Sequence, residues 1–202
     1  GTGYDLGAST DWLDAVSRVG VRTQHTLTLS GGNSRSNYRA SIDYRNAQGI
    51  DRYSGRREYG GRMSLNHTNK SGLLTFGVNI APRIAYRKNA SWDVFRNAIE
   101  ANPTTPIMDP QNPTQYYNFK GQTASYNPVE LENLDKNTGT TKLLDWDVSA
   151  KLNIFPLLLK NPGKQMLTTQ LTFADHQYDN YNQFFRPSTS TLCINSGRNG
   201  EA

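Results

Sequence analysis

Apolar and polar residues alternate with a period of two along several segments, and this pattern restricts the fold more than any other feature. The clearest example is 143–154, where apolar side chains alternate with aspartate, serine, lysine and asparagine. Shorter examples are 38–45, 74–80 and 167–173. Successive side chains on a strand point to opposite faces, so each segment has one apolar and one polar face. The pattern predicts β-strands.

The connections between these segments alternate between short and long. Short, turn-like connections are 31–37, 67–72 and 156–164, and longer ones are 46–57 and 89–141. Short turns join neighbouring strands as hairpins. We therefore expect sequential antiparallel pairing of strands at 23–30, 38–46, 57–66, 73–87, 142–155 and 165–178. Short turns at one end and long loops at the other are typical of bacterial outer-membrane barrels, whose short turns are periplasmic. The stretches 46–57, 89–141 and 174–202 are then expected to face outward.

A soluble antiparallel sandwich would also alternate. However, the alternation of 143–154 lasts for about 12 residues, more than the roughly 5–6 of common soluble strands. It suffices for the roughly 9–11 residues that cross a bilayer. We expect Ile42, Phe76, Val78, Val148, Leu152 and Leu171 to face lipid. We expect a polar set to face the lumen: Arg39, Asp43, Asn79, Asp145, Asp147, Lys151 and Gln170.

Composition excludes several other classes of protein. No segment approaches the run of roughly 18 apolar residues that a membrane-spanning helix needs. The net charge is +5, but the basic residues are scattered rather than clustered, so we expect no nucleic-acid partner. The single cysteine, Cys193, excludes an internal disulfide.

The sequence contains no catalytic constellation. The three histidines, His25, His67 and His176, lie far apart, and none has a His or Cys partner at metal-ligand spacing. Asp145 and Asp147 could be a glycosidase pair, but an electrostatic network with Lys151 on the same face is favoured. No nucleophile elbow, phosphate loop or dinucleotide fingerprint occurs. The sequence predicts no enzyme activity, no metal and no cofactor.

The long segment 89–141 has features of an ordered loop. Ser91-Trp92-Asp93 can cap a short helix, and apolar residues follow at helical spacing until Asn102-Pro103 ends it. Aromatic residues then accumulate, and they need burial or a ligand. Elsewhere, Trp12, Tyr44, Tyr86 and Trp146 are candidates either for an interfacial aromatic girdle or for ordinary packing.

Three stretches resemble the SusC/RagA family of TonB-dependent outer-membrane receptors. The first comprises 10–14 and 25–32, the second 37–44 and 48–50, and the third 62–66 with the later 102–107 and 126–128. Their order and spacing are similar to the first barrel strands after the plug, and the resemblance covers about residues 9 to 180.

The resemblance implies a plugged barrel of about 22 strands in the outer membrane of a Gram-negative bacterium. It also implies import of oligosaccharides or peptides, a SusD-like lipoprotein as a lid, and a TonB complex that acts through the plug. Residues 1–202 would then be a partial barrel domain that lacks the plug and most strands, with 89–141 as a long extracellular loop. The rest of the barrel and outer-membrane lipid would be its other partners.

Within that loop, the resemblance makes six aromatic side chains candidates for contact with the lid or the substrate: Trp92, Phe95, Tyr116, Tyr117, Phe119 and Tyr126. The alternative function is a soluble all-β carbohydrate-binding module, in which some of these rings would stack on a sugar. The two hypotheses differ in a simple property, because only the barrel segment requires detergent to stay in solution.

Overall fold

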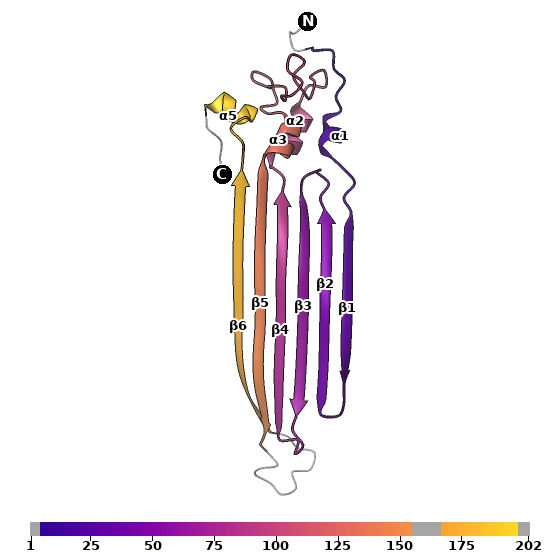
Figure 1. The fold of residues 1–202 in the computed structure, drawn as a ribbon, viewed down its shortest axis with the longest axis vertical. Coiled ribbons are helices and arrows are strands. Elements are labelled where there is room, and N and C mark those ends of the chain that lie inside the picture. The colour runs from indigo at the N-terminus through magenta and orange to yellow at the C-terminus, as the bar shows by residue number, and fades with distance from the viewer. Residues whose placement is uncertain (1–4, 155–166, 198–202) are drawn as a thin grey trace.

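The structure, a computed structural model, describes residues 5–154 and 167–197. Its strands form one sheet in the order β1-β2-β3-β4-β5-β6, and every neighbouring pair is antiparallel (Figure 1). The strands are β1 (Arg22–Gly32), β2 (Ser36–Gln48), β3 (Gly55–Thr68), β4 (Leu74–Asn89), β5 (Lys136–Asn153) and β6 (Thr168–Phe185). This meander confirms the predicted all-β fold and the predicted strand order.

The last two strands are longer than predicted at the end that carries the long loop. β5 begins at Lys136 rather than near residue 142, and β6 continues to Phe185. The connecting loop is therefore 90–135 rather than 89–141, and the stretch 174–202, expected as a loop, is a strand up to Phe185. The added residues are mostly polar and do not alternate. They stay extended because each pairs with the other strand in one continuous ladder, in which backbone hydrogen bonds are made whatever the side chains are.

Asparagine side chains close the two short turns that the structure describes. In the β1–β2 turn, Asn33 Oδ1 accepts hydrogen bonds from the backbone N–H groups of Arg35 and Ser36, both at 2.9 Å. In the β3–β4 turn, Asn69 Oδ1 accepts from the N–H of Leu73 at 3.0 Å, and Gly72 takes a left-handed conformation with φ of 71°. The third predicted turn, 156–164 with Asn161-Pro162-Gly163, lies outside the described residues.

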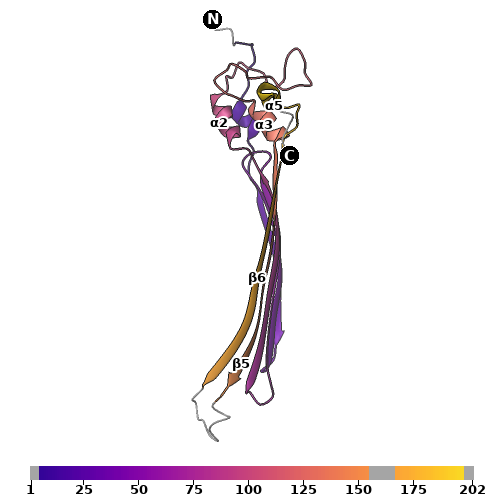
Figure 2. The same ribbon diagram turned by 90° about the vertical axis from the view of Figure 1, so that its left-hand side faces the viewer.

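The register divides the side chains between two faces. Leu27 pairs with Ile42, Leu65 with Val78, and Val78 with Val148, so the apolar positions of neighbouring strands stand side by side. The predicted polar residues occupy the alternate positions and share the opposite face. Figure 2 shows the sheet edge-on as one long, gently curved layer, with the helices gathered beyond one end.

The helices form a cap, defined here as residues 5–21, 90–135 and 186–197. They are α1 (Trp12–Val16), α2 (Asp93–Glu100), α3 (Pro128–Leu134) and α5 (Thr191–Ser196). The cap has its own hydrophobic core, which contains Trp12, Val16, Val94, Ala98, Ala101, Phe119, Ala124 and Leu131. Among the described residues, no helix is long and apolar enough to cross a membrane.

The cap core confirms the predicted order of the long loop and corrects the interpretation of Trp12. The predicted helix is α2, and two of its apolar residues, Val94 and Ala98, are buried in the core. Trp12 is 3% exposed, packs edge-on against Phe119 at 5.4 Å between ring centroids, and donates its indole N–H to the Asn102 carbonyl at 3.0 Å. Trp12 is therefore a core residue of the cap and cannot contribute to an aromatic girdle.

Candidate functional site

The polar face of the sheet carries hydrogen bonds and ion pairs that run across the strands. Asn79 on β4 donates its side-chain amide to Asp147 on β5 at 2.9 Å, and His176 on β6 contacts Asp145 on β5. Nearer the cap, Glu58 on β3 accepts from two neighbours, Arg45 on β2 at 3.1 Å and Arg56 at 2.9 Å. Strand pairing brings the Asn79–Asp147, Asp145–His176 and Arg45–Glu58 pairs together, whereas Arg56 and Glu58 are two residues apart on β3.

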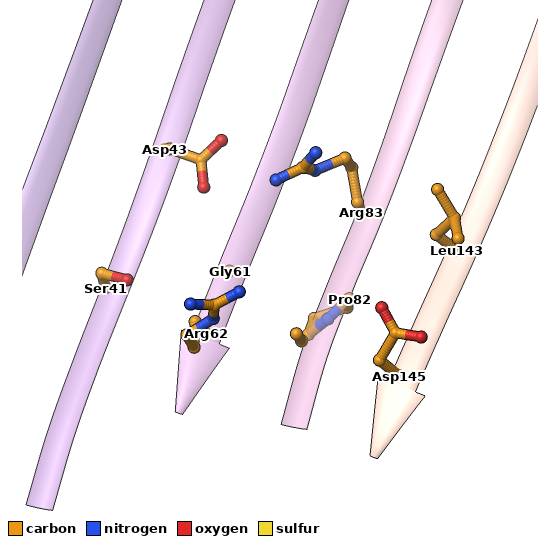
Figure 3. A pocket seen from close by; sticks show the side chains of 9 residues that line it. Ser41, Asp43, Gly61, Arg62, Pro82, Arg83, Leu143 and Asp145 are labelled. Atoms are coloured by element: carbon orange, nitrogen blue, oxygen red, sulfur yellow. The ribbon is translucent and has the colours of Figure 1, made fainter. Parts of the chain in front are cut away.

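A pocket of about 380 Å³ lies at the centre of this face and is lined by charged side chains from four adjacent strands (Figure 3). These are Asp43 on β2, Arg62 on β3, Arg83 on β4 and Asp145 on β5. Gly60, the cross-strand partner of Asp43, has no side chain, and a Cβ there would lie 2.6 Å from the Asp43 carboxylate. The absence of a side chain at Gly60 leaves the space that the Asp43 carboxylate occupies.

The same region interrupts the strand pairing. The pairs between β3 and β4 stop after Gly60–Arg83 and resume at Met63–Ile80, so the gap covers residues 61–62 and 81–82, including Gly61 and Pro82. Proline has no N–H and cannot donate to the ladder, and glycine weakens a strand interior, so this is the expected place for a break. A charged hollow in the middle of one face is suited to polar contact with a molecule or segment lying against the sheet.

The register places all seven residues predicted to face the lumen on this polar face: Arg39, Asp43, Asn79, Asp145, Asp147, Lys151 and Gln170. The sequence predicts that Lys151 forms an electrostatic network with Asp145 and Asp147, but the two aspartates contact other residues. Among the ion pairs of the described residues, none uses Lys151, which lies four and six positions along β5 from Asp147 and Asp145. The aspartates bind Asn79 and His176 instead. Sequence reasoning missed Arg62, Arg83 and His176, although alternation alone would have put Arg62 and Arg83 on this face.

The opposite face is apolar and exposed. Its uncovered side chains include Leu27 (68% exposed), Ile42 (63%), Leu171 (77%) and Phe173 (68%). A contiguous apolar surface of this kind on a protein marks a site for contact with lipid or with another protein. It rules out a β-sandwich built from the described residues alone, because no second sheet covers this face.

Aromatic rings form a row on the apolar face toward the cap. His25, Tyr44, Tyr59 and Tyr86 follow one another across β1 to β4, with ring centroids 6.3, 5.1 and 6.5 Å apart. We call these four residues the aromatic row. Two of the predicted girdle residues, Tyr44 and Tyr86, belong to it. Trp146 instead packs against Phe173 at 5.6 Å within the apolar face.

The six aromatic candidates for contact with a lid or substrate differ in how deeply the cap buries them. Phe119 is 1% exposed and lies in the cap core, so no ligand can reach it in this structure. Phe95, Tyr117 and Tyr126 are partly buried against the same core, and Tyr116 is half-buried, with its hydroxyl accepting a hydrogen bond from Asn133 at 3.1 Å. Trp92 is 99% exposed. Only Trp92 presents a whole aromatic ring to solvent.

Buried carboxylates in helix α3, and at Asp135 directly after it, contact two other segments, the loop 49–54 and residues 186–197. Glu130 accepts hydrogen bonds from the backbone N–H of Thr191 at 2.6 Å and from its hydroxyl. Glu132 accepts from the N–H groups of Arg52 and Tyr53 at 2.6 and 3.2 Å, and Asp135 pairs with Arg186 through two contacts at 2.7 and 2.5 Å. None of these carboxylates is more than 4% exposed.

Burial raises the pKa of two of these carboxyl groups, Glu130 and Glu132. The hydrogen bonds they accept act in the opposite direction, and Asp135 and Asp51 respectively raise the pKa further, so the increase prevails. A carboxyl pKa that is higher in the folded protein favours folding in the protonated state. The stabilisation that such a carboxyl group contributes is fully present below the ordinary glutamate pKa. It is lost as the pH rises through the pKa of the group in the folded protein.

We therefore expect the cap to be more stable at mildly acidic pH than at pH 7. The substitution Glu132→Gln keeps an acceptor oxygen for Arg52 and Tyr53 but removes the ionisation. The slope of the cap's unfolding free energy against pH should therefore become smaller. Denaturant titrations followed by tryptophan fluorescence at several pH values measure this. Glu100→Gln, at an exposed site on α2, is the matched control and should leave the slope unchanged. Equal slopes in all three proteins would contradict the expectation.

The part of the chain that the structure describes holds no group of three or more His, Cys, Asp or Glu residues that could bind a metal ion. The chemistry available at the polar face is hydrogen bonding and charge pairing. At the cap it is aromatic and apolar contact.

Comparison with known proteins shows similarity to a TonB-dependent receptor and to a solved importer structure. No protein-family model matches the chain. It is similar to the TonB-dependent receptor SusC of Bacteroides thetaiotaomicron, with 28% identity over 153 residues, which are 74% of this chain and 14% of the receptor. It is similar in structure to a chain of the RagAB peptide importer in its closed-closed state, with a TM-score of 0.68 and 18% identity, over 93% of this chain and 21% of that chain.

These similarities confirm the expected resemblance to SusC and RagA receptors and show that the sheet has the fold of part of such a protein. The chain spans only a small part of the length of either relative. Both relatives carry names of a receptor or an importer rather than of an enzyme.

Proposed function

We propose that this chain is a segment of an outer-membrane TonB-dependent transporter that imports oligosaccharides or peptides together with a SusD-like lipoprotein. The observation that carries the proposal is the division of the sheet into an exposed apolar face and a charged polar face. In a barrel the apolar face meets lipid and the polar face lines the lumen or touches the plug. The similarity to a TonB-dependent receptor and to a peptide importer supports the same assignment.

The two edges of the sheet support a larger barrel. Within the described residues, β1 and β6 each pair with a strand on one side only, so the outer edge of each has no strand partner there. Lipid offers no partner for the backbone groups of an open edge, so a membrane sheet must close on itself. Further strands of the same receptor would complete the ladder on both sides. A TonB complex acting through the receptor's plug would then open the lumen.

In this proposal the cap is extracellular and contacts the lipoprotein lid or the substrate. Trp92, fully exposed at the start of α2, and Ile99, seven residues later and 72% exposed, provide an apolar contact surface on that helix. Exposed tryptophans at interfaces often carry a large share of the binding free energy. The soluble carbohydrate-binding module remains the second hypothesis, and a requirement for detergent separates the two.

The test of the cap's role is Trp92→Ala in the complete receptor. We expect the affinity for the SusD-like lipoprotein, or the uptake rate, to fall about 30-fold if Trp92 is an interface hot spot worth about 2 kcal/mol. Lys120→Ala, another exposed cap position, is the control and should have little effect. Lipoprotein binding is measured by titration with purified lipoprotein, and uptake with radiolabelled peptides or oligosaccharides. Unchanged binding and unchanged uptake in Trp92→Ala would reduce the cap to a packing element.

A further inference from the structure

A second pocket, of about 370 Å³, is lined by an unusual number of cations. Its lining includes Arg18, Arg52, Arg56, Arg57 and Lys88, together with Tyr53 and Tyr86. The side chains come from the N-terminal segment, from β3 and β4, and from the 49–54 loop. We call this the basic pocket. Arg56 also belongs to the polar-face network through Glu58, but Arg18, Arg52, Arg57 and Lys88 belong neither to that network nor to the cap core.

The register shows which side of the sheet the basic pocket opens on. Arg57 lies two residues from Tyr59, and Lys88 lies two residues from Tyr86, so both cations alternate onto the face of the aromatic row. Two residues along a strand span about 7 Å. The basic pocket therefore follows directly after the apolar face and the aromatic row, on the side of the cap.

Several of these cations form no ion pair among the described residues. Arg18 donates to two carbonyls, of Gly49 at 3.1 Å and Ser54 at 2.8 Å, and Arg52 donates to the Asp14 carbonyl at 2.9 Å. Arg56 is neutralised by Glu58. Among the ion pairs of the described residues, none includes Arg52, Arg57, Lys88 or Lys136.

The nearby carboxylates accept hydrogen bonds from other groups, and two lysines lie over the Tyr53 ring. Asp51 accepts hydrogen bonds from Ser54, and Glu132 accepts from two backbone N–H groups. The Lys88 and Lys136 ammonium groups lie 5.8 and 4.7 Å from the centre of the Tyr53 ring. The basic pocket thus keeps an excess of positive charge next to an apolar surface.

We propose that the basic pocket binds the phosphate group of an anionic lipid in the outer leaflet. This inference rests on the proposed placement of the apolar face in the membrane. Arginine and lysine bind phosphate through charge-assisted hydrogen bonds, and basic residues at the edge of an apolar belt attract anionic headgroups. Free phosphate has the same chemistry. The lipid is favoured because the adjoining aromatic row and apolar face provide a surface for its acyl chains.

The test uses the complete receptor in neutral detergent and three probes: dihexanoyl phosphatidic acid, dihexanoyl phosphatidylcholine and inorganic phosphate. We expect phosphatidic acid to bind most tightly. The double variant Arg57→Gln, Lys88→Gln should bind it about 30-fold more weakly, at about fivefold for each cation removed. The control is Arg39→Gln, Lys151→Gln, which removes the same charge from the polar face and should bind normally. Native mass spectrometry and calorimetry report the binding.

Each alternative result has a definite meaning. Equal binding by the wild type and the Arg57, Lys88 variant overturns the site. If inorganic phosphate binds as tightly as phosphatidic acid, the lipid is not the source of the phosphate. If phosphatidylcholine binds as tightly as phosphatidic acid, the net negative charge of the headgroup plays no role. Failure of the membrane placement itself would be seen separately, as tolerance of charges on the apolar face, whatever the result with phosphate.

Discussion

The substitution Val148→Arg is expected to prevent the receptor from folding in a bilayer. Val148 is the middle residue of five successive apolar-face positions on β5, 144 to 152, and its neighbours across the sheet are Val78 and Phe173. An arginine at the middle of the bilayer on a lipid-facing position costs roughly 2–4 kcal/mol. This corresponds to a decrease of about 30- to 1,000-fold in the folding equilibrium.

The control for this prediction is the next residue on the same strand. Ser149 faces the polar side opposite Gly77, which has no side chain, so an arginine at position 149 has room and access to water. Both variants are made in the complete receptor and refolded into lipid vesicles, and the folded fraction is read from the heat-dependent mobility on SDS gels. If the two arginines were tolerated equally, the assignment of faces would be wrong, and the transporter proposal with it.

The division into faces could be predicted because each strand carries it locally. Alternation at 38–45 or 143–154 is enough to assign a side chain to a face, and short turns such as the one at Asn69 determine which strands pair. The ends of β5 and β6 could not be predicted, because residues 136–141 and 179–185 lack alternation. Their extended structure comes from pairing with each other, which is a property of two segments rather than of one.

Contacts between distant segments were equally inaccessible from the sequence. The partnership of His176 with Asp145 depends on the exact register of β5 and β6, and a shift of one residue would place the histidine on the other face. The burial of Phe119 depends on Trp12, which precedes β1 and is separated from Phe119 by four strands. For this reason the aromatics of the loop could be recognised as a group but not divided into core and surface.

That division leads to the second large effect, which is expected for Phe119→Ala. The Phe119 ring packs edge-on against Trp12 and lies 6.0 Å from Tyr117, so its removal leaves a cavity in a small core. Replacing a buried phenylalanine by alanine typically costs about 3–5 kcal/mol. This loss is large for a core of eight buried residues in the described part of the chain, three of which are alanines.

The expected consequence is a locally unfolded cap on an intact sheet. Elements with separate cores can open independently, and the cap core contains no residue of β1 to β6. Hydrogen exchange measured by mass spectrometry on the folded receptor should show the α2 and α3 amides exchanging at least 100-fold faster in Phe119→Ala, since about 3 kcal/mol exceeds two factors of ten. The amides of β2 to β4 should keep their protection. Trp92→Ala removes a larger ring from a fully exposed position and should change neither region. Loss of protection in the strands as well would mean that cap and sheet unfold as one unit.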